Sequence, residues 1–217
     1  MELPFAILES MQETEKLNAI KKWLGAGSIN IFGRPFAGKD TQGQRLATLL
    51  GGTLIGGGEI LRSDDMPIHI QQAMRTGMLI PSEDYIKIVL PNLSHKRLVG
   101  HPIILSSVGR WIGEESSVIK VTQASGHPIM AVINLGINED VARLRWQLAR
   151  PIGDRGRRHD DAGELLEIRL REFKNKTEPV LQAYRGLRLL IDIDGDQPAQ
   201  AVTQSIITKL CDFIEHS

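Results

Sequence analysis

The feature that most constrains this chain is a glycine-rich loop between a short apolar run and an amphipathic stretch. Residues 28–32 read SINIF, and residues 33–41 read GRPFAGKDT, close to the pattern G-x-x-x-x-G-K-[ST]. In that pattern backbone N–H groups converge on phosphate oxygens, the lysine reaches the terminal phosphates, and the start of a helix adds a favourable dipole. The chain departs from it at Asp40, and the hydroxyl is delayed to Thr41. We therefore expect a strand, a phosphate-binding loop and a helix in succession.

Short apolar runs alternate with helical stretches along the rest of the chain. The candidate strands are residues 28–32, 53–55, 102–105, 129–135 and 187–193, and the candidate helices are 4–24, 39–50, 67–76, 82–93, 112–124, 138–150, 160–184 and 198–215. This alternation is typical of an α/β fold with a parallel sheet. Such sheets bind ligands at the carboxyl ends of their strands, where the loops gather.

Composition excludes several classes of protein. The 217 residues carry 26 basic and 26 acidic side chains, and this neutral balance argues against a nucleic-acid groove or a membrane-surface protein. The single cysteine, Cys211, excludes an intramolecular disulfide framework and a CxxC metal site. No apolar run approaches the ~20 residues of a membrane span, and the N-terminus lacks the features of a secretory signal. We expect a cytoplasmic protein that binds neither nucleic acid nor membrane, whereas protein partners stay open.

Several segments, in order, resemble the motifs of adenylate kinases and related nucleoside monophosphate kinases. The loop is similar to their G-x-P-G-x-G-K-G-T-Q, with Phe36 and Asp40 in place of two family glycines. GGEILR at 57–62 is similar to T-G-D-x-L-R, GMLIPSE at 77–83 to G-x-L-V-x-D-E, and RHDD at 158–161 to R-x-D-D. SSVGR at 106–110 stands in the place of D-G-F-P-R, while TEP at 177–179 and DGDQP at 194–198 resemble T-x-P and D-G-x-x-P. The resemblance runs from about Ser28 to the C-terminus.

The resemblance implies the fold and its parts. It predicts a three-layer α/β fold of the P-loop NTPase type, with a central five-stranded parallel sheet, over residues 28–217. A small helical insert at about 56–95 would bind the nucleoside monophosphate, and a short lid at about 151–160 would close over the donor. Residues 1–27 would form an N-terminal helical extension, which we expect to cover the sheet or its edge rather than to bind a partner.

The implied activity is transfer of the γ-phosphate of ATP, with Mg²⁺, to a nucleoside monophosphate, with AMP the first candidate and GMP the second. A nucleotide-binding regulatory protein with degraded catalysis, or a kinase for another small acceptor, are the alternatives. The implied catalytic residues are Lys39, Arg110, Arg158 and Arg169. The implied ATP-binding residues are Gly33, Phe36, Ala37, Gly38, Lys39, Asp40, Thr41, Arg150 and Gln197. Those implied for the acceptor are Gly57, Arg62, Met78, Leu79, Ile80, Gly109, Arg110, Glu114, Arg158 and Arg169.

The donor side leaves alternatives open. The family arginine near the donor base corresponds to Arg150 or Arg145, and one gapless placement puts Trp146 there. Trp146 would then stack on a purine, although a buried core tryptophan is the commoner explanation. Pro151–His159 contains no cysteine quartet, so it is not a zinc-bearing lid; Arg155 and Arg157 stand beside Arg158 as further donor-phosphate candidates.

Glu114 lies four residues after Arg110, where adenylate kinases carry the glutamine that reads the adenine edge. An ionised glutamate only accepts hydrogen bonds, whereas glutamine both donates and accepts. The N1–H and N2–H₂ groups of guanine would suit a carboxylate better than adenine does, which makes GMP a serious rival to AMP. The alternative is that Glu114 faces solvent on helix 112–124.

Asp40 and Ser106 suggest an exchange of roles. The aspartate of D-G-F-P-R helps to hold Mg²⁺ through its water shell in the family, and Ser106 stands in its place here. Because Mg²⁺ binds a few carboxylates together with phosphates and waters, we hypothesise that Asp40, with Thr41 beside it, organises the metal. The alternative is that Asp40 points away and caps the helix.

Overall fold

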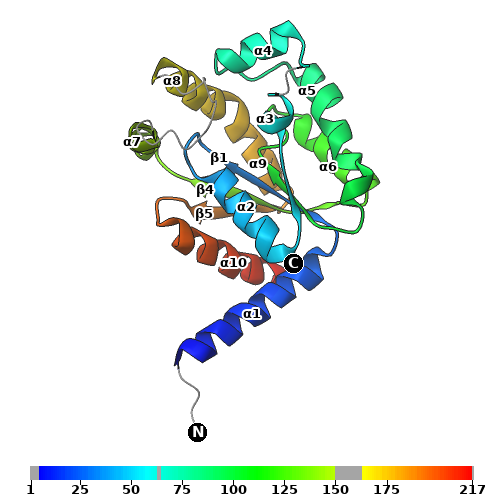
Figure 1. Ribbon diagram of the computed structural model, residues 1–217, viewed down its shortest axis with the longest axis vertical. Helices are drawn as coiled ribbons and strands as arrows, with labels where there is room; N and C mark the ends of the chain where they lie inside the picture. The colour runs from blue at the N-terminus through cyan, green and yellow to red at the C-terminus, as the bar shows by residue number, and fades with distance from the viewer. Residues whose placement is uncertain (1–4, 63–64, 150–162, 217) are drawn as a thin grey trace.

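The computed structural model describes residues 5–62, 65–149 and 163–216. Its centre is one five-stranded parallel sheet with the strand order β2-β3-β1-β4-β5 (Figure 1). The strands are β1 (Ser28–Gly33), β2 (Thr53–Gly56), β3 (Ile103–Ser106), β4 (Ile129–Gly136) and β5 (Leu190–Asp194). The predicted α/β fold and its five-stranded parallel sheet are confirmed.

The two faces of the sheet bury two clusters of apolar side chains. Along β4, Ala131, Ile133 and Leu135 enter one cluster, whereas Val132 enters the other. Every residue of β1 is buried, because this strand lies in the middle of the sheet and is covered on both faces. At the edge, β5 alternates instead, and its Asp192 is exposed.

Helices cover both faces of the sheet (Figure 1). Helices α2 and α10 cover one face, and α6 and α9 cover the other. The helices are α1 (Phe5–Leu24), α2 (Lys39–Leu50), α3 (Gly57–Ile60), α4 (Ile68–Arg75), α5 (Ser82–Val89), α6 (Glu114–Ala124), α7 (Glu139–Ala149), α8 (Gly163–Glu172), α9 (Glu178–Gly186) and α10 (Ala199–Glu215). Two 3₁₀ turns, Leu90–Ser94 and Lys96–Leu98, follow α5.

The prediction of one continuous helix over 160–184 is wrong. Helix α8 ends at Glu172, a π-helical segment spans Phe173–Thr177, and α9 begins at Glu178. The N–H of Glu178 reaches back five residues to the carbonyl of Phe173. Pro179 gives the physical reason, because proline lacks the N–H that an α-helix would use and its ring crowds the carbonyl four residues earlier. A wider turn before the proline accommodates both effects.

The structure also contains a helix that was not predicted, and some boundaries differ from the prediction. The four-residue helix α3 has no sequence signal, and α6 begins at Glu114 because Gly113 adopts a left-handed conformation (φ 93°). The last strand begins at Leu190 rather than at 187. A turn after the end of α9 at Gly186 occupies the intervening residues, with Arg188 at φ 59° and the N–H of Leu189 bonded to the carbonyl of Tyr184.

Helix α1 packs on α10 and α2, with its N-terminal part extending beyond the body of the molecule (Figure 1). Ile20 and Leu24 are buried in the same apolar cluster as β1. The rings of Trp23 and Phe213 meet edge to face with their centroids 6.1 Å apart. The C-terminal half of the extension is therefore part of the core. Among the described residues, none of the helices has the length and apolar character needed to cross a bilayer.

Candidate active site

The phosphate-binding loop joins the carboxyl end of the central strand β1 to the start of α2. It turns tightly, because a Cβ atom on Gly33 would lie 2.9 Å from the Cβ of Ala37 and 3.0 Å from the carbonyl oxygen of Leu135. Gly38 has a φ of 90° directly before α2. Phe36 has a φ of 66°, a conformation that costs little for glycine and more for phenylalanine. Phe36 therefore keeps a backbone conformation that suits the glycine found at this position in the motif that the loop resembles.

Asp40 in the first turn of α2 points toward the end of β3. The hydroxyl of Ser106 donates a hydrogen bond to Oδ1 of Asp40, with an O···O distance of 2.6 Å. The carboxylate of Asp40 is therefore held at the end of β3. The contact brings together two residues at which the chain departs from the motifs it resembles, an aspartate in place of a glycine and a serine in place of an aspartate.

The turn after β3 is fixed by a buried asparagine of β1. The side-chain amide of Asn30 donates to the carbonyl of Val108 at 2.7 Å, and its oxygen accepts from the N–H of Val108 at 3.2 Å. Asn30 has no exposed surface. This double hydrogen bond holds the segment that carries Arg110 against the central strand, next to the phosphate-binding loop.

Two arginines of the predicted catalytic set lie close together. Burial, and next the positive charge of Arg169, lower the pKa of Arg110 to about 10. The Nε–H of Arg110 donates to the hydroxyl of Thr177 at 3.4 Å. Two cations in one partly buried place repel each other, and a phosphate dianion between them would remove the repulsion. The arrangement is suited to anion binding.

Arg169 also contacts the predicted acceptor insert. Its Cγ lies 3.2 Å from where a Cβ of Gly77 would be, and Gly77 has a φ of 72°. Earlier in the insert, the guanidinium of Arg62 lies next to Gly58. Met78 is half exposed, whereas Ile80 is buried.

Gly57 and Gly109 meet at a tyrosine that the sequence did not single out. The N–H of Gly109 donates to the hydroxyl of Tyr85 at 3.3 Å, and that hydroxyl occupies the space that a Cβ of Gly57 would need. Burial raises the pKa of Tyr85 well above its ordinary value. Apart from belonging to the apolar face of α5, Tyr85 carries no signal in the sequence that would have identified this role.

Glu114 does not face solvent, because only 2% of its surface is exposed. Its Oε2 accepts hydrogen bonds from the N–H groups of Arg110 and Trp111, at 2.6 and 2.9 Å. Its other oxygen, Oε1, is buried and accepts no hydrogen bond from the part of the chain that the structure describes. The side chain thus closes the turn that carries Arg110 and retains one acceptor atom.

On the donor side, the loop after β5 lies against the phosphate-binding loop. A Cβ on Gly195 would be 3.6 Å from the carbonyl oxygen of Ala37. The guanidinium of Arg145 donates to the carbonyl of Gly195 at 2.8 Å and to that of Phe36 at 3.4 Å, so this arginine ties the two loops together. Trp146 is partly buried and packs against the core.

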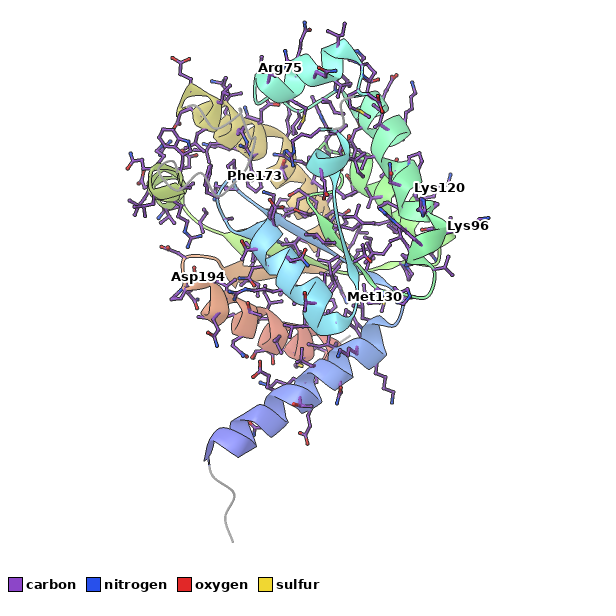
Figure 2. The ribbon with its side chains drawn as sticks, viewed as in Figure 1. Arg75, Lys96, Lys120, Met130, Phe173 and Asp194 are labelled. Atoms are coloured by element: carbon purple, nitrogen blue, oxygen red, sulfur yellow. The ribbon has the colours of Figure 1, made fainter. Side chains whose placement is uncertain are left out.

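The loop after β5 is itself ordered by Asp194, which Figure 2 shows at the carboxyl end of β5 beside α10. Asp194 accepts from the N–H of Asp196 at 2.9 Å and from the side-chain amide of Gln197 at 3.0 Å. These two hydrogen bonds, the first more than the second, lower the pKa of Asp194. Gln197 is thereby held at the edge of the donor side.

Part of the predicted site lies outside the described residues. These are Arg150, the lid at about 151–160 and the arginines Arg155, Arg157 and Arg158. Among the residues that the structure describes, no group of three or more His, Cys, Asp or Glu side chains could hold a metal ion. Thr41 is exposed on the first turn of α2.

Comparison with known proteins supports the class that the fold and the loop define. No protein-family model matches the chain. The fold is similar to that of a gluconokinase from Sinorhizobium meliloti 1021, with a TM-score of 0.60, 18% identity, and coverage of 88% of this chain and 94% of the other. This likeness shows the α/β fold, and the sequence relatives described next place the protein among the P-loop phosphotransferases, in the class of kinases.

Sequence relatives define the family. The chain is 31% identical over 181 residues to an adenylate kinase from Cyanothece sp. strain PCC 7425, covering 81% of this chain and 91% of the relative. It is 31% identical over 185 residues to an adenylate kinase from Prochlorococcus marinus strain AS9601, covering 83% and 96%. The chain belongs to the adenylate kinase family, as its motifs indicated.

The contact between Gly57 and Tyr85 gives a stability prediction. Gly57→Ala forces a methyl group onto the Tyr85 hydroxyl, and we expect the free energy of unfolding to fall by about 1–3 kcal/mol, the usual cost of overpacking. Tyr85→Phe removes the clashing oxygen, so the double variant should recover part of the loss. Urea denaturation of the single and double variants measures the coupling.

Gly186→Ala is the matched control, because nothing lies within 4 Å of a Cβ at that position. Its free energy of unfolding should stay within about 0.5 kcal/mol of the wild type. Additive losses from Gly57→Ala and Tyr85→Phe would contradict the packing described here.

Proposed function

We propose that this kinase transfers the γ-phosphoryl group of ATP, with Mg²⁺, to a nucleoside monophosphate, with AMP the first candidate acceptor and GMP the second. The observation that carries the proposal is the 2.6 Å hydrogen bond between Ser106 and Asp40. It joins the helix that begins at Lys39 to the strand whose following turn carries Arg110. A donor-phosphate loop and an acceptor-side arginine therefore meet at one edge of the sheet.

Each charged group has a role in this proposal. Lys39 stabilises negative charge on the transferring phosphoryl group, and the paired Arg110 and Arg169 hold the acceptor phosphate. Phosphoryl transfer needs mainly positioning and charge stabilisation, so no general base is required. The two guanidiniums repel each other, and Glu172 and Glu114 offset the charge only in part, since the pKa of Arg110 is still lowered; binding of the acceptor phosphate there would therefore be favoured.

The insert at about 56–95 would bind the acceptor, with Arg62 on its phosphate and the backbone of Leu79 and Ile80 along the base. The lid at about 151–160, with Arg158, would close over the donor. Water exclusion by such a lid would protect the donor from hydrolysis.

The residues around Asp40 fit a magnesium ion. Mg²⁺ favours one or two carboxylates completed by phosphate oxygens and water, and Asp40 supplies one carboxylate beside the phosphate-binding loop. Ser106 and Asp40 are hydrogen-bonded, so the serine hydroxyl fixes the orientation of the carboxylate. The bound ion would neutralise charge on the donor phosphates, while Asp40 orients it directly or through a water and Thr41 lies on the same turn.

A coupled assay with ATP and AMP, GMP, CMP, UMP or dTMP tests the function. Turnover of one of these acceptors supports the proposal. Nucleotide binding without turnover would favour a nucleotide-binding regulatory protein with degraded catalysis. Turnover only of other small acceptors would favour a kinase for another small acceptor.

Lys39 gives the first prediction on catalysis. Lys39→Met removes a preorganised charge from the transferring phosphoryl group, which typically raises the barrier by ~3–4 kcal/mol and lowers kcat by about 10²–10³-fold. Steady-state kinetics with the preferred acceptor measures kcat, and circular dichroism checks the fold. Lys120→Met, on the outer surface of α6 (Figure 2), is the control and should retain wild-type kcat. Near-normal turnover in Lys39→Met would refute its role.

Glu114 gives a prediction on the acceptor base. A glutamine at this position can accept both backbone N–H groups of the turn, so Glu114→Gln should fold normally. If Oε1 reads guanine N–H groups, the ratio of kcat/KM for GMP to that for AMP should fall by about 10–100-fold, since one unmet polar contact costs about 1–3 kcal/mol. The neighbouring Glu115→Gln should not change the ratio. An unchanged ratio in Glu114→Gln leaves Glu114 with the structural role alone.

Asp40 gives a prediction on the metal. Asp40→Gly should shift the free Mg²⁺ concentration needed for half-maximal activity at least about tenfold upward, because one carboxylate is lost from the ion's surroundings. Adding Ser106→Asp restores a carboxylate at the strand end and should bring the requirement back. Calorimetry of ATP binding with and without Mg²⁺ gives a second readout that is independent of turnover. An unaltered Mg²⁺ dependence in Asp40→Gly would remove the support for this exchange of roles.

A further inference from the structure

Two neighbouring peptide groups of the acceptor insert are held by side chains from other elements. The N–H of Leu79 donates to Oε2 of Glu172 at 3.0 Å. The carbonyl oxygen of Ile80 accepts from the indole Nε1–H of Trp111 at 2.9 Å. Glu172 ends α8, and Trp111 lies in the turn between β3 and α6, so the segment is held from two directions.

Lys176 joins these two contacts into one unit. Its ammonium nitrogen lies 2.6 Å from Oε2 of Glu172 and 4.0 Å from the centroid of the Trp111 ring. The side chains of Glu172 and Lys176 are 11% and 21% exposed. An ion pair and a cation–π contact this far removed from water orient their partners more firmly than an exposed pair would. We call Trp111, Glu172 and Lys176 the clamp.

The π-helical segment places the clamp beside the acceptor arginines. Lys176 lies within this segment, and the next residue, Thr177, accepts the hydrogen bond from Arg110. Arg169, on the preceding helix, packs against Gly77, two residues before Leu79. The π-helical turn thus positions both Lys176, which contacts the residues that hold the insert backbone, and Thr177, which contacts Arg110. Such turns occur frequently at functional sites.

We propose that the clamp positions the backbone of Leu79 and Ile80 for the acceptor and so sets its affinity, without taking part in phosphoryl transfer. This inference rests on the proposed function for its link to the acceptor. The clamp residues are positioning residues, because they hold a backbone that would line the base and themselves bind no reacting atom. Loss of the clamp therefore lets the insert leave the core before the acceptor arrives, and the acceptor must supply the free energy of ordering it.

Amide hydrogen exchange tests the clamp without reference to activity. In Glu172→Ala the exchange rate of the Leu79 amide should rise at least about tenfold, because its acceptor is gone and local opening becomes easier. Glu172→Gln keeps an oxygen for that N–H and should restore most of the protection. Lys174→Met, an exposed lysine of the same π-helical segment, is the control. Unchanged exchange of Leu79 in a folded Glu172→Ala protein would overturn the clamp.

Kinetics test its consequence. Trp111→Phe removes the N–H donor and keeps an aromatic ring for Lys176. In this variant and in Lys176→Met, KM for the acceptor should rise about tenfold, equivalent to one weak hydrogen bond. We expect kcat and KM for ATP to stay within about twofold, since the donor site and the arginine pair are intact. A fall in kcat with an unchanged acceptor KM would overturn the positioning role.

The two arms separate this inference from the proposed function. If the wild type phosphorylates no nucleoside monophosphate but Glu172→Ala exposes Leu79, the proposed function fails and the clamp stands as a structural feature. If the wild type is active and the exchange of Leu79 is unchanged, the clamp fails alone.

Discussion

The rest of the structure depends on the pairing of β1 with β3 on one side and β4 on the other. Ile31 at the end of β1 stands beside Ser106 of β3 and Ile133 of β4. Because all three strands run in the same direction, their carboxyl ends open at one edge and their loops must meet there. The phosphate-binding loop follows β1, and the turn with Arg110 follows β3, so the two halves of the site are neighbours by topology. Asn30 then fixes the second turn to the first strand with a buried pair of hydrogen bonds.

The strand order also explains the exchange between Asp40 and Ser106. The start of α2 and the end of β3 are adjacent, as the 2.6 Å hydrogen bond between the Ser106 hydroxyl and the Asp40 carboxylate shows. A carboxylate on either side would face the same volume. If Asp40 takes the metal-organising role, as proposed above, the acidic group has moved from one element to the other, and the charge that this edge of the sheet presents is conserved although the sequence motif changes.

The features that could be predicted from the sequence are those with a regular hydrophobic periodicity or a known motif. The strands, the phosphate-binding loop and the family were all visible in runs such as SINIF and in the order of short motifs. The π-helical segment was not, because Pro179 signals a helix start as readily as an interruption. Glu172, Lys176 and Tyr85 were missed for another reason. Their roles arise from contacts with residues 93, 65 and 24 positions away, to Leu79, Trp111 and Gly109, which no local pattern records.

The proximity of Arg110 and Arg169 is an electrostatic cost within the candidate site, and the carboxylates of Glu172 and Glu114 offset it in part. Burial, and next the positive charge of Arg169, lower the pKa of Arg110 to about 10, so Arg110 stays charged at neutral pH and part of the repulsion persists in the folded chain. The unfolded chain does not experience this repulsion, and the packing of the core must offset it. A phosphate dianion placed between the guanidiniums turns the repulsion into two attractions. Because that gain would exist only in the folded protein, the acceptor binding proposed above would be linked to folding, and the anion would stabilise the arrangement that recognises it.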